Sequence, residues 1–292
     1  MTNFIQTCIS GLNLGSIYAL MALGYTMVYG IAKMLNFAHG DIIMVGAYTV
    51  IVAVARLHMP SILGIFVAIL VCAVLGITIE FLAYRPLRKS PPLAVLITAI
   101  GVSYLLQNLA LLIFGSEQES FPTLFSLPTL KIGDVQIAGI TVLTLAVTAL
   151  IMIGLTLFIS KTRIGKAMRA VSEDKEAAEL MGISVNRTIT VTFAIGSALA
   201  AVASIFYGAT YTYIKPTTGS MPGIKAFTAA VFGGIGSIPG AMLGGILLGV
   251  IEQFSKSLIS TLWSDAIVFG VLVLVLVVKP SGLLGKKIRE KV

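Results

Sequence analysis

The sequence predicts an all-α integral membrane protein, a polytopic helical bundle of seven to nine spans, nominally eight, with Gly-rich broken or re-entrant segments. Of its 292 residues, 57% are hydrophobic and only 11% are charged, whereas about 25% of the residues of a soluble domain are charged. The mean hydropathy is +1.01. The apolar runs are unbroken and about twice as long as a barrel strand of about 10 residues. A soluble fold and a β-barrel are therefore excluded.

Seven apolar runs, bounded by charged residues or proline, are long enough to cross a bilayer, which takes about 20 residues. They cover residues 4–31, 41–57, 61–84, 93–115, 138–160, 188–213 and 264–279. The first run lacks the basic start and cleavage site of a signal peptide, so we expect a permanent span.

A further apolar stretch at 222–256 is rich in glycine. It holds eight glycines from Gly223 to Gly249, together with Pro239, and these interrupt any single helix. We expect either two short spans, or a re-entrant hairpin followed by one span.

The lysines and arginines predict the orientation, because cytoplasmic loops are rich in them. If 32–40, 85–92, 161–187 and the tail from Lys279 share one side, that side collects 15 of the 20 basic residues. We therefore expect 161–187 and the C-terminus to be cytoplasmic and the N-terminus to lie outside. The net charge of +8 follows from the same bias and does not indicate a nucleic-acid partner.

The segment 161–187 is too polar to enter lipid and is the main predicted cytosolic surface. Ser172, followed by Glu173 and Asp174, predicts an N-cap with acids in the first helical turn. Gly182 predicts the left-handed residue that ends the helix. The residues that would give this short helix an exposed apolar patch are Ala177, Ala178, Leu180 and Met181. The alternative is that any loop of this length contains some helix without a partner.

Several stretches carry a resemblance to a known family. They read EAAELMG at 176–182, GLNLGSIYALMALGYTMVYGI at 11–31, LNFAHGD at 35–41, RAVSEDKEAAELMGI at 169–183 and MPGIKAFTAAVFGGIGSIPGAMLGG at 221–245. The first resembles the E-A-A-x-x-x-G loop of ABC-importer permeases, although no proline follows the glycine. Together they resemble the branched-chain amino-acid ABC permeases, and in particular the H-type subunit of the high-affinity Leu, Ile and Val importer. Urea and short-amide permeases share much of this pattern.

The resemblance implies a permease that moves branched-chain amino acids into the cytoplasm, driven by ATP hydrolysis on partner subunits. The implied partners are a homologous second permease, two cytosolic ATPase subunits and an extracytoplasmic substrate-binding protein, in a bacterial or archaeal-type plasma membrane. The residues implied to contact an ATPase are Glu176, Ala177, Ala178 and Gly182. The whole chain, 1–292, would be one transmembrane permease domain with 161–187 as its coupling loop.

The sequence shows neither a nucleotide-binding motif nor the clustered acids or metal ligands of an enzyme. No G-x-x-x-x-G-K-[ST] nucleotide motif occurs, so ATP hydrolysis is expected on partners and not on this chain. Cys8 and Cys72 lack metal-ligand spacing, and we expect neither a metal nor another cofactor. A stand-alone secondary transporter is the less favoured alternative, because the clear spans hold no central charged relay. An intramembrane enzyme would need clustered acids or metal ligands, which the two histidines and the dispersed acidic residues do not supply.

Helix breaks within the apolar zone indicate the translocation path. Non-helical backbone at this depth must line a cavity or be buried in protein, because lipid cannot hydrogen-bond it. The candidates are Asn36, His39, Gly40, Gly236 and Gly240. Close packing of small residues is the alternative for the glycines, and His39 and Asp41 are interpreted as polar residues at the membrane edge.

Other polar residues within the spans are weaker candidates. We expect Gln107, Asn108 and Glu252 to face the bundle interior, because lipid cannot hydrogen-bond them. Glu80, five residues before Arg85, is expected to form a local pair or to extend toward the membrane surface.

Overall fold

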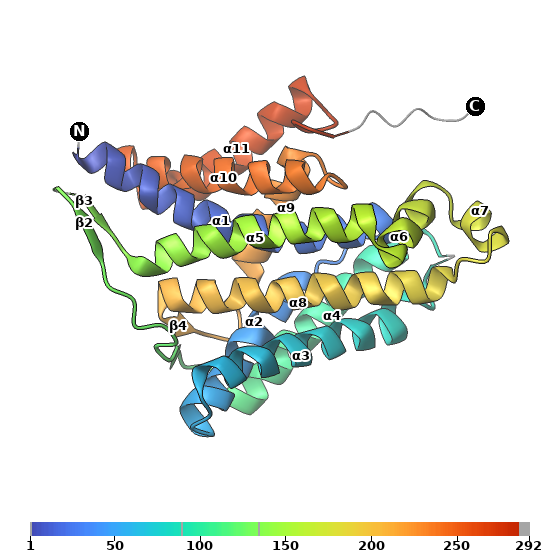
Figure 1. The fold of residues 1–292 in the computed structure, drawn as a ribbon, viewed down its shortest axis with the longest axis horizontal. Coiled ribbons are helices and arrows are strands. Elements are labelled where there is room, and N and C mark those ends of the chain that lie inside the picture. Colours follow the sequence, from blue (N-terminus) through green and yellow to red (C-terminus); the bar gives the residue numbers. More distant parts are fainter. Residues whose placement is uncertain (1, 89, 134, 286–292) are drawn as a thin grey trace. The chain divides into compact units, whose positions relative to one another are not determined.

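The computed structural model describes residues 2–88, 90–133 and 135–285, and it is almost entirely helical (Figure 1). The helices are α1 (Thr2–Ala32), α2 (His39–Val50), the π-helix η1 (Ile51–Arg56), α3 (Ser61–Ile79), the π-helix η2 (Glu80–Tyr84), α4 (Pro92–Phe114), α5 (Gly139–Lys161), α6 (Arg163–Glu173), α7 (Lys175–Leu180), α8 (Val185–Tyr211), α9 (Ser220–Gly233), α10 (Ile238–Leu258) and α11 (Thr261–Val278). Of the C-terminal tail from Lys279, whose side of the membrane was predicted, residues 286–292 lie outside the described ranges.

Four short strands form two antiparallel pairs between the helices. Strand β1 (Glu119–Ser120) pairs with β4 (Tyr213–Ile214), and β2 (Leu130–Ile132) pairs with β3 (Val135–Ile137).

Eight helices in the described part of the chain are long and apolar enough to cross a membrane. They cover Asn3–Ala32, His39–Arg56, Ser61–Tyr84, Pro92–Phe114, Gly139–Lys161, Val185–Tyr211, Ile238–Leu258 and Thr261–Val278. All seven runs predicted from hydropathy are among them, each end within three residues of its expected place. The predicted fold class, a polytopic helical bundle, is confirmed.

The Gly-rich stretch forms a short helix, a turn and one span. Helix α9 has 14 residues, which is about 21 Å at 1.5 Å per residue and shorter than a hydrocarbon core of about 30 Å. Helix α10 has 21 residues and is long enough to cross. The turn between them contains Gly236, whose φ is +94°, a backbone conformation that favours glycine. The structure therefore has a short helix followed by one full-length span, which matches neither expected arrangement in full.

The chain divides into two compact units. Unit 1 comprises Met1–Thr26, Leu127–Met152 and Lys225–Val292, and unit 2 comprises Met27–Ser126 and Ile153–Ile224. The divisions fall inside α1, α5 and α9, so each of these helices contributes to both units.

Small residues allow the helices of each unit to approach closely. In unit 1 a Cβ on Gly249 would collide with the backbone of Leu14, so α10 and the first part of α1 pack backbone to backbone. In unit 2 a Cβ on Gly46 of α2 would lie 2.6 Å from Ser204 Oγ of α8 and 3.2 Å from Cys72 Sγ of α3. These contacts hold α10 against α1 in unit 1, and α2 against α3 and α8 in unit 2.

Candidate functional site

Two short helices, α6 and α7, fold the polar segment between α5 and α8. Asp174 is the N-cap of α7, and its carboxylate accepts hydrogen bonds from the backbone N–H groups of Glu176 and Ala177, each 3.0 Å long. The prediction that Ser172 caps this helix is wrong. Ser172 lies in the last turn of α6, where its hydroxyl donates to the carbonyl oxygen of Arg169. Asp174, which was expected in the first turn, is itself the N-cap, because its carboxylate reaches two free backbone N–H groups.

Gly182 ends α7 as predicted, with a φ of +80°. Its N–H donates to the carbonyl oxygen of Glu179, and the N–H of Ile183 donates to that of Ala178. Ala178 is buried and anchors α7, whereas Leu180 and Met181 are 90% and 82% exposed. The predicted exposed apolar patch is confirmed at Ala177, Leu180 and Met181. It is wrong at Ala178, whose side chain is buried.

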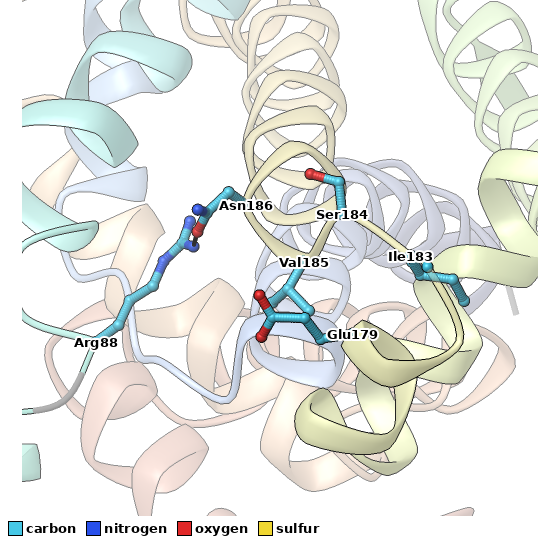
Figure 2. A pocket seen from close by; sticks show the side chains of 7 residues that line it. Arg88, Glu179, Ile183, Ser184, Val185 and Asn186 are labelled. Carbon is cyan, nitrogen blue, oxygen red and sulfur yellow. Dashed lines mark hydrogen bonds between the residues drawn. The ribbon is translucent and has the colours of Figure 1, made fainter.

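The end of α7 and the start of α8 border a surface pocket of about 410 Å³. Its lining residues are Arg88, Glu179, Gly182, Ile183, Ser184, Val185 and Asn186. Figure 2 shows the Arg88 side chain extending to the amide of Asn186, to which its guanidinium donates a hydrogen bond. Figure 1 shows α7 beyond the first turn of α8 and β4 beyond its last turn, so these two segments lie at opposite ends of that span.

A buried carboxylate holds Arg88 at the pocket. Glu80 is fully buried and forms ion pairs with Arg85, at 3.2 Å, and with Arg88. The hydroxyl of Thr190 in α8 donates to it over 2.7 Å. Burial lowers the pKa of the Arg88 guanidinium, and the Glu80 carboxylate opposes this shift. The expected local pair of Glu80 with Arg85 is confirmed, whereas the contacts with Arg88 and Thr190 were not predicted.

Lys175 attaches α7 to the end of α1. Its ammonium group donates a 2.9 Å hydrogen bond to the carbonyl oxygen of Ala32. Burial lowers the pKa of Lys175, and the positive charges of Arg88 and Lys33 lower it further.

The predicted break after the first span is present in unit 2. Helix α1 ends at Ala32, and α2 begins at His39. Asn36 is buried and its amide oxygen accepts a 2.9 Å hydrogen bond from the Tyr84 hydroxyl. A Cβ on Gly40 would lie 3.0 Å from the Cα of Gly223. The break is therefore packed against the start of α9.

Gly240 also lies at a close backbone contact, in unit 1. A Cβ there would lie 2.5 Å from the carbonyl oxygen of Gly233. The turn that contains Gly236 thus brings the end of α9 against the start of α10.

The polar residues of the spans differ in exposure. Gln107 donates a 2.9 Å hydrogen bond to Asp41, which is buried and not at an exposed edge. Asn108, by contrast, is exposed and its amide donates to the carbonyl oxygen of Tyr104 in its own helix. The expectation that Asn108 faces the interior is wrong, since α4 turns it outward.

Glu252 is buried in unit 1 within a charged network. It accepts hydrogen bonds from Lys225 at 2.8 Å, Lys256 at 2.6 Å and the Tyr18 hydroxyl at 2.9 Å. Lys225 also pairs with Asp265 at 2.6 Å. The expectation that Glu252 faces the interior is confirmed.

Eight apolar spans and a capped polar segment between two of them define a multi-pass membrane protein. Residues 7–276 match the family described as "Branched-chain amino acid transport system / permease component", and the chain belongs to this family. The predicted family is thereby confirmed. Its members are transport permeases and not enzymes.

Full-length relatives carry the same description. The high-affinity branched-chain amino acid transport system permease protein BraD of Pseudomonas aeruginosa is 47% identical over 99% of this chain and 98% of its own length. The corresponding LivH protein of Escherichia coli is 45% identical over the same shares. The probable LivH permease of Methanocaldococcus jannaschii is 29% identical over 92% of this chain and 89% of its own.

Proposed function

We propose that this chain is the transmembrane permease subunit of an ABC importer that moves leucine, isoleucine and valine into the cytoplasm, driven by ATP hydrolysis on partner subunits. The observation that carries the proposal is the exposed α7 of a chain that is 47% identical, over 99% of its length, to a branched-chain permease. The partners are a homologous second permease, two cytosolic ATPase subunits and an extracytoplasmic substrate-binding protein.

The contact with the ATPase is made by the exposed Glu176, Ala177 and Gly182, while the buried Ala178 holds α7 in position for it. Two large apolar side chains, Leu180 and Met181, are almost fully exposed at the end of α7. Adjacent exposed apolar groups outside a membrane are typical of a surface that a partner covers. The cap at Asp174 and the stop at Gly182 hold this surface in one conformation.

The chain is one transmembrane permease domain, with 161–187 as its cytoplasmic coupling loop and a cytoplasmic C-terminus. Because α8, α10 and α11 are three crossings, this orientation requires that α9 and the segment before it together carry the chain back across the membrane. Its location is a bacterial or archaeal-type plasma membrane. Single cysteines at Lys166 and Glu117 test this orientation, because an impermeant reagent should label them from opposite sides. Labelling of both from outside would contradict it.

The translocation path is edged by Asn36, His39 and Gly40 and by Gly236 and Gly240. Two of these residues, Asn36 and His39, are polar and buried within a span or beside it. Gly40 and Gly240 lie at close backbone contacts that larger residues would block, and Gly236 has a φ of +94°.

Uptake into vesicles tests the transported substrate. The reconstituted chain and its candidate partners should accumulate leucine, isoleucine and valine only when ATP is present on the ATPase side. Urea and acetamide serve as comparison solutes. Uptake of urea or acetamide without leucine would assign the chain to a short-amide importer, and uptake without ATPase subunits would indicate a stand-alone transporter.

A further inference from the structure

Three acidic side chains are buried in the described spans, and one of them differs from the others. Asp41, Glu80 and Glu252 are each at most 1% exposed. Glu80 is paired with two arginines, and Glu252 with two lysines. Asp41 has no lysine or arginine partner within the described ranges. Among these three buried carboxylates, Asp41 is the one that no cation within the described ranges neutralises.

Neutral groups surround the Asp41 carboxylate. The Gln107 amide nitrogen donates to it over 2.9 Å and lies 3.2 Å from the hydroxyl oxygens of both Ser103 and Ser220. Asp41 also lies in the first turn of α2, where the helix dipole favours a negative charge. An amide and a partial dipole charge do not replace a full positive charge, and a carboxylate in a low-dielectric environment requires a cation or a proton.

The Asp41 site lies well inside the apolar zone, at the starts of two helices. Gln107 precedes the end of α4, Phe114, by seven residues, which is about 10 Å along the helix. The close approach of Gly40 to Gly223 brings the first turns of α2 and α9 together. In transporters, substrates bind at such interrupted helices within the bilayer.

We propose that Asp41 binds the α-ammonium group of the transported amino acid, and that Gln107, Ser103 and Ser220 orient the carboxylate for it. This inference rests on the proposed function and assigns a substrate contact to it. A zwitterionic amino acid carries the positive charge that Asp41 lacks, whereas urea and short amides are neutral. The site therefore favours amino acids over the solutes of the related permeases.

The test replaces Asp41 in the complete reconstituted importer. Asp41→Asn removes the charge but retains an oxygen that accepts from Gln107, so the packing is conserved. Leucine uptake per assembled complex should fall about tenfold or more, because hydrogen bonds to charged groups are stronger than neutral ones. Binding of the ATPase subunits should stay within about twofold of wild type, because α7 is untouched. Asp41→Glu should recover part of the uptake.

Glu117→Gln is the matched control, since it makes the same carboxylate-to-amide change at an exposed position, and its uptake should equal that of wild type. A leucine analogue with a photoreactive diazirine, added to complexes arrested during ATP hydrolysis, gives a second readout. It should label peptides that contain Asp41, Ser103 to Gln107 or Ser220 in wild type but not in Asp41→Asn.

Wild-type uptake and labelling in Asp41→Asn would overturn the inference. Lost uptake with unchanged labelling at these peptides would also overturn it, because Asp41 would then carry a proton and not bind the ammonium group. Failure of the wild-type complex to take up any branched-chain amino acid would instead overturn the proposed function.

Discussion

The ammonium group of Lys175, in the first turn of α7, lies 2.9 Å from the carbonyl oxygen of Ala32, the last residue of α1. The last carbonyls of a helix have no partner within it, and a cation stabilises this negative end. Helix α7 is thereby attached to the residues that lead from α1 to Asn36. A displacement of α7 would act directly on the break at the start of α2.

Replacing Lys175 should therefore weaken the link between ATP hydrolysis and transport. In Lys175→Met the side-chain length is nearly conserved, but the hydrogen bond is lost, at a cost of about 1.5–3 kcal/mol for a charged donor. We expect several-fold fewer leucine molecules transported per ATP hydrolysed, at normal ATPase binding. Lys175→Arg, which retains a charged donor, is the control. An unchanged ratio in Lys175→Met would show that the contact plays no part in coupling.

The pKa of Lys175 should respond to its charged neighbours. Burial and the positive charges of Arg88 and Lys33 lower it below its ordinary value of 10.5. The protonated form therefore destabilises the folded state, fully at pH values below the native pKa, and this destabilisation is relieved as the pH rises toward 10.5. Removing one like charge in Lys33→Gln should raise the native pKa. Nuclear magnetic resonance titration of ¹³C-methylated lysine measures it, and a wild-type value of 10.5 or higher would refute the expectation.

Glu252 should be important for stability because it neutralises buried cations. Glu252→Gln leaves Lys225, 6% exposed, with Asp265 as its remaining carboxylate, and we expect a loss of about 1–3 kcal/mol in unfolding free energy. The double variant with Lys225→Met should recover part of this loss, since the uncompensated cation is then absent. Thermal unfolding of the purified chain measures both. Equal stability of wild type and Glu252→Gln would contradict the assignment.

Larger side chains at Gly236 and Gly240 in the Gly-rich turn should obstruct transport. Gly236→Leu would strain a backbone at a φ of +94°, and Gly240→Leu would push against the Gly233 carbonyl oxygen. We expect fewer assembled complexes in both variants and lower uptake in those that assemble. Uptake is therefore divided by the amount of assembled complex. Normal uptake per complex in both would remove these glycines from the path and leave them a packing role.

The spans and the end of α7 were predictable because their causes are local. A run of about 20 apolar residues is sufficient to identify a span, and Gly182 directly follows the apolar patch that it ends. The N-cap was assigned to the wrong residue because α6 and α7 are adjacent. Ser172 and Asp174 both have the required chemistry, and only the backbone decides which of them faces free N–H groups.

The partners of the buried charges could not be predicted, because they are distant in sequence. Asp41 and Gln107 are 66 residues apart, and Glu80 and Thr190 are 110 apart. Asn108 was placed on the wrong side because α4 is apolar on nearly all its faces, so its sequence does not indicate which face turns inward.

ATP-dependent leucine uptake by Gly182 and Glu176 variants shows whether partner ATPases drive this permease through α7. Gly182→Val places a β-branched residue at a φ of +80°, at a cost of about 1–2 kcal/mol, and Glu176→Lys puts a positive charge at the start of α7. Gly182→Asn tolerates the left-handed conformation, and Gly154→Val has open space around its Cβ; both serve as controls. We expect that Gly182→Val and Glu176→Lys insert normally but lose ATPase stimulation and uptake together, while both controls retain them. Wild-type stimulation and uptake in Gly182→Val and Glu176→Lys would contradict this expectation.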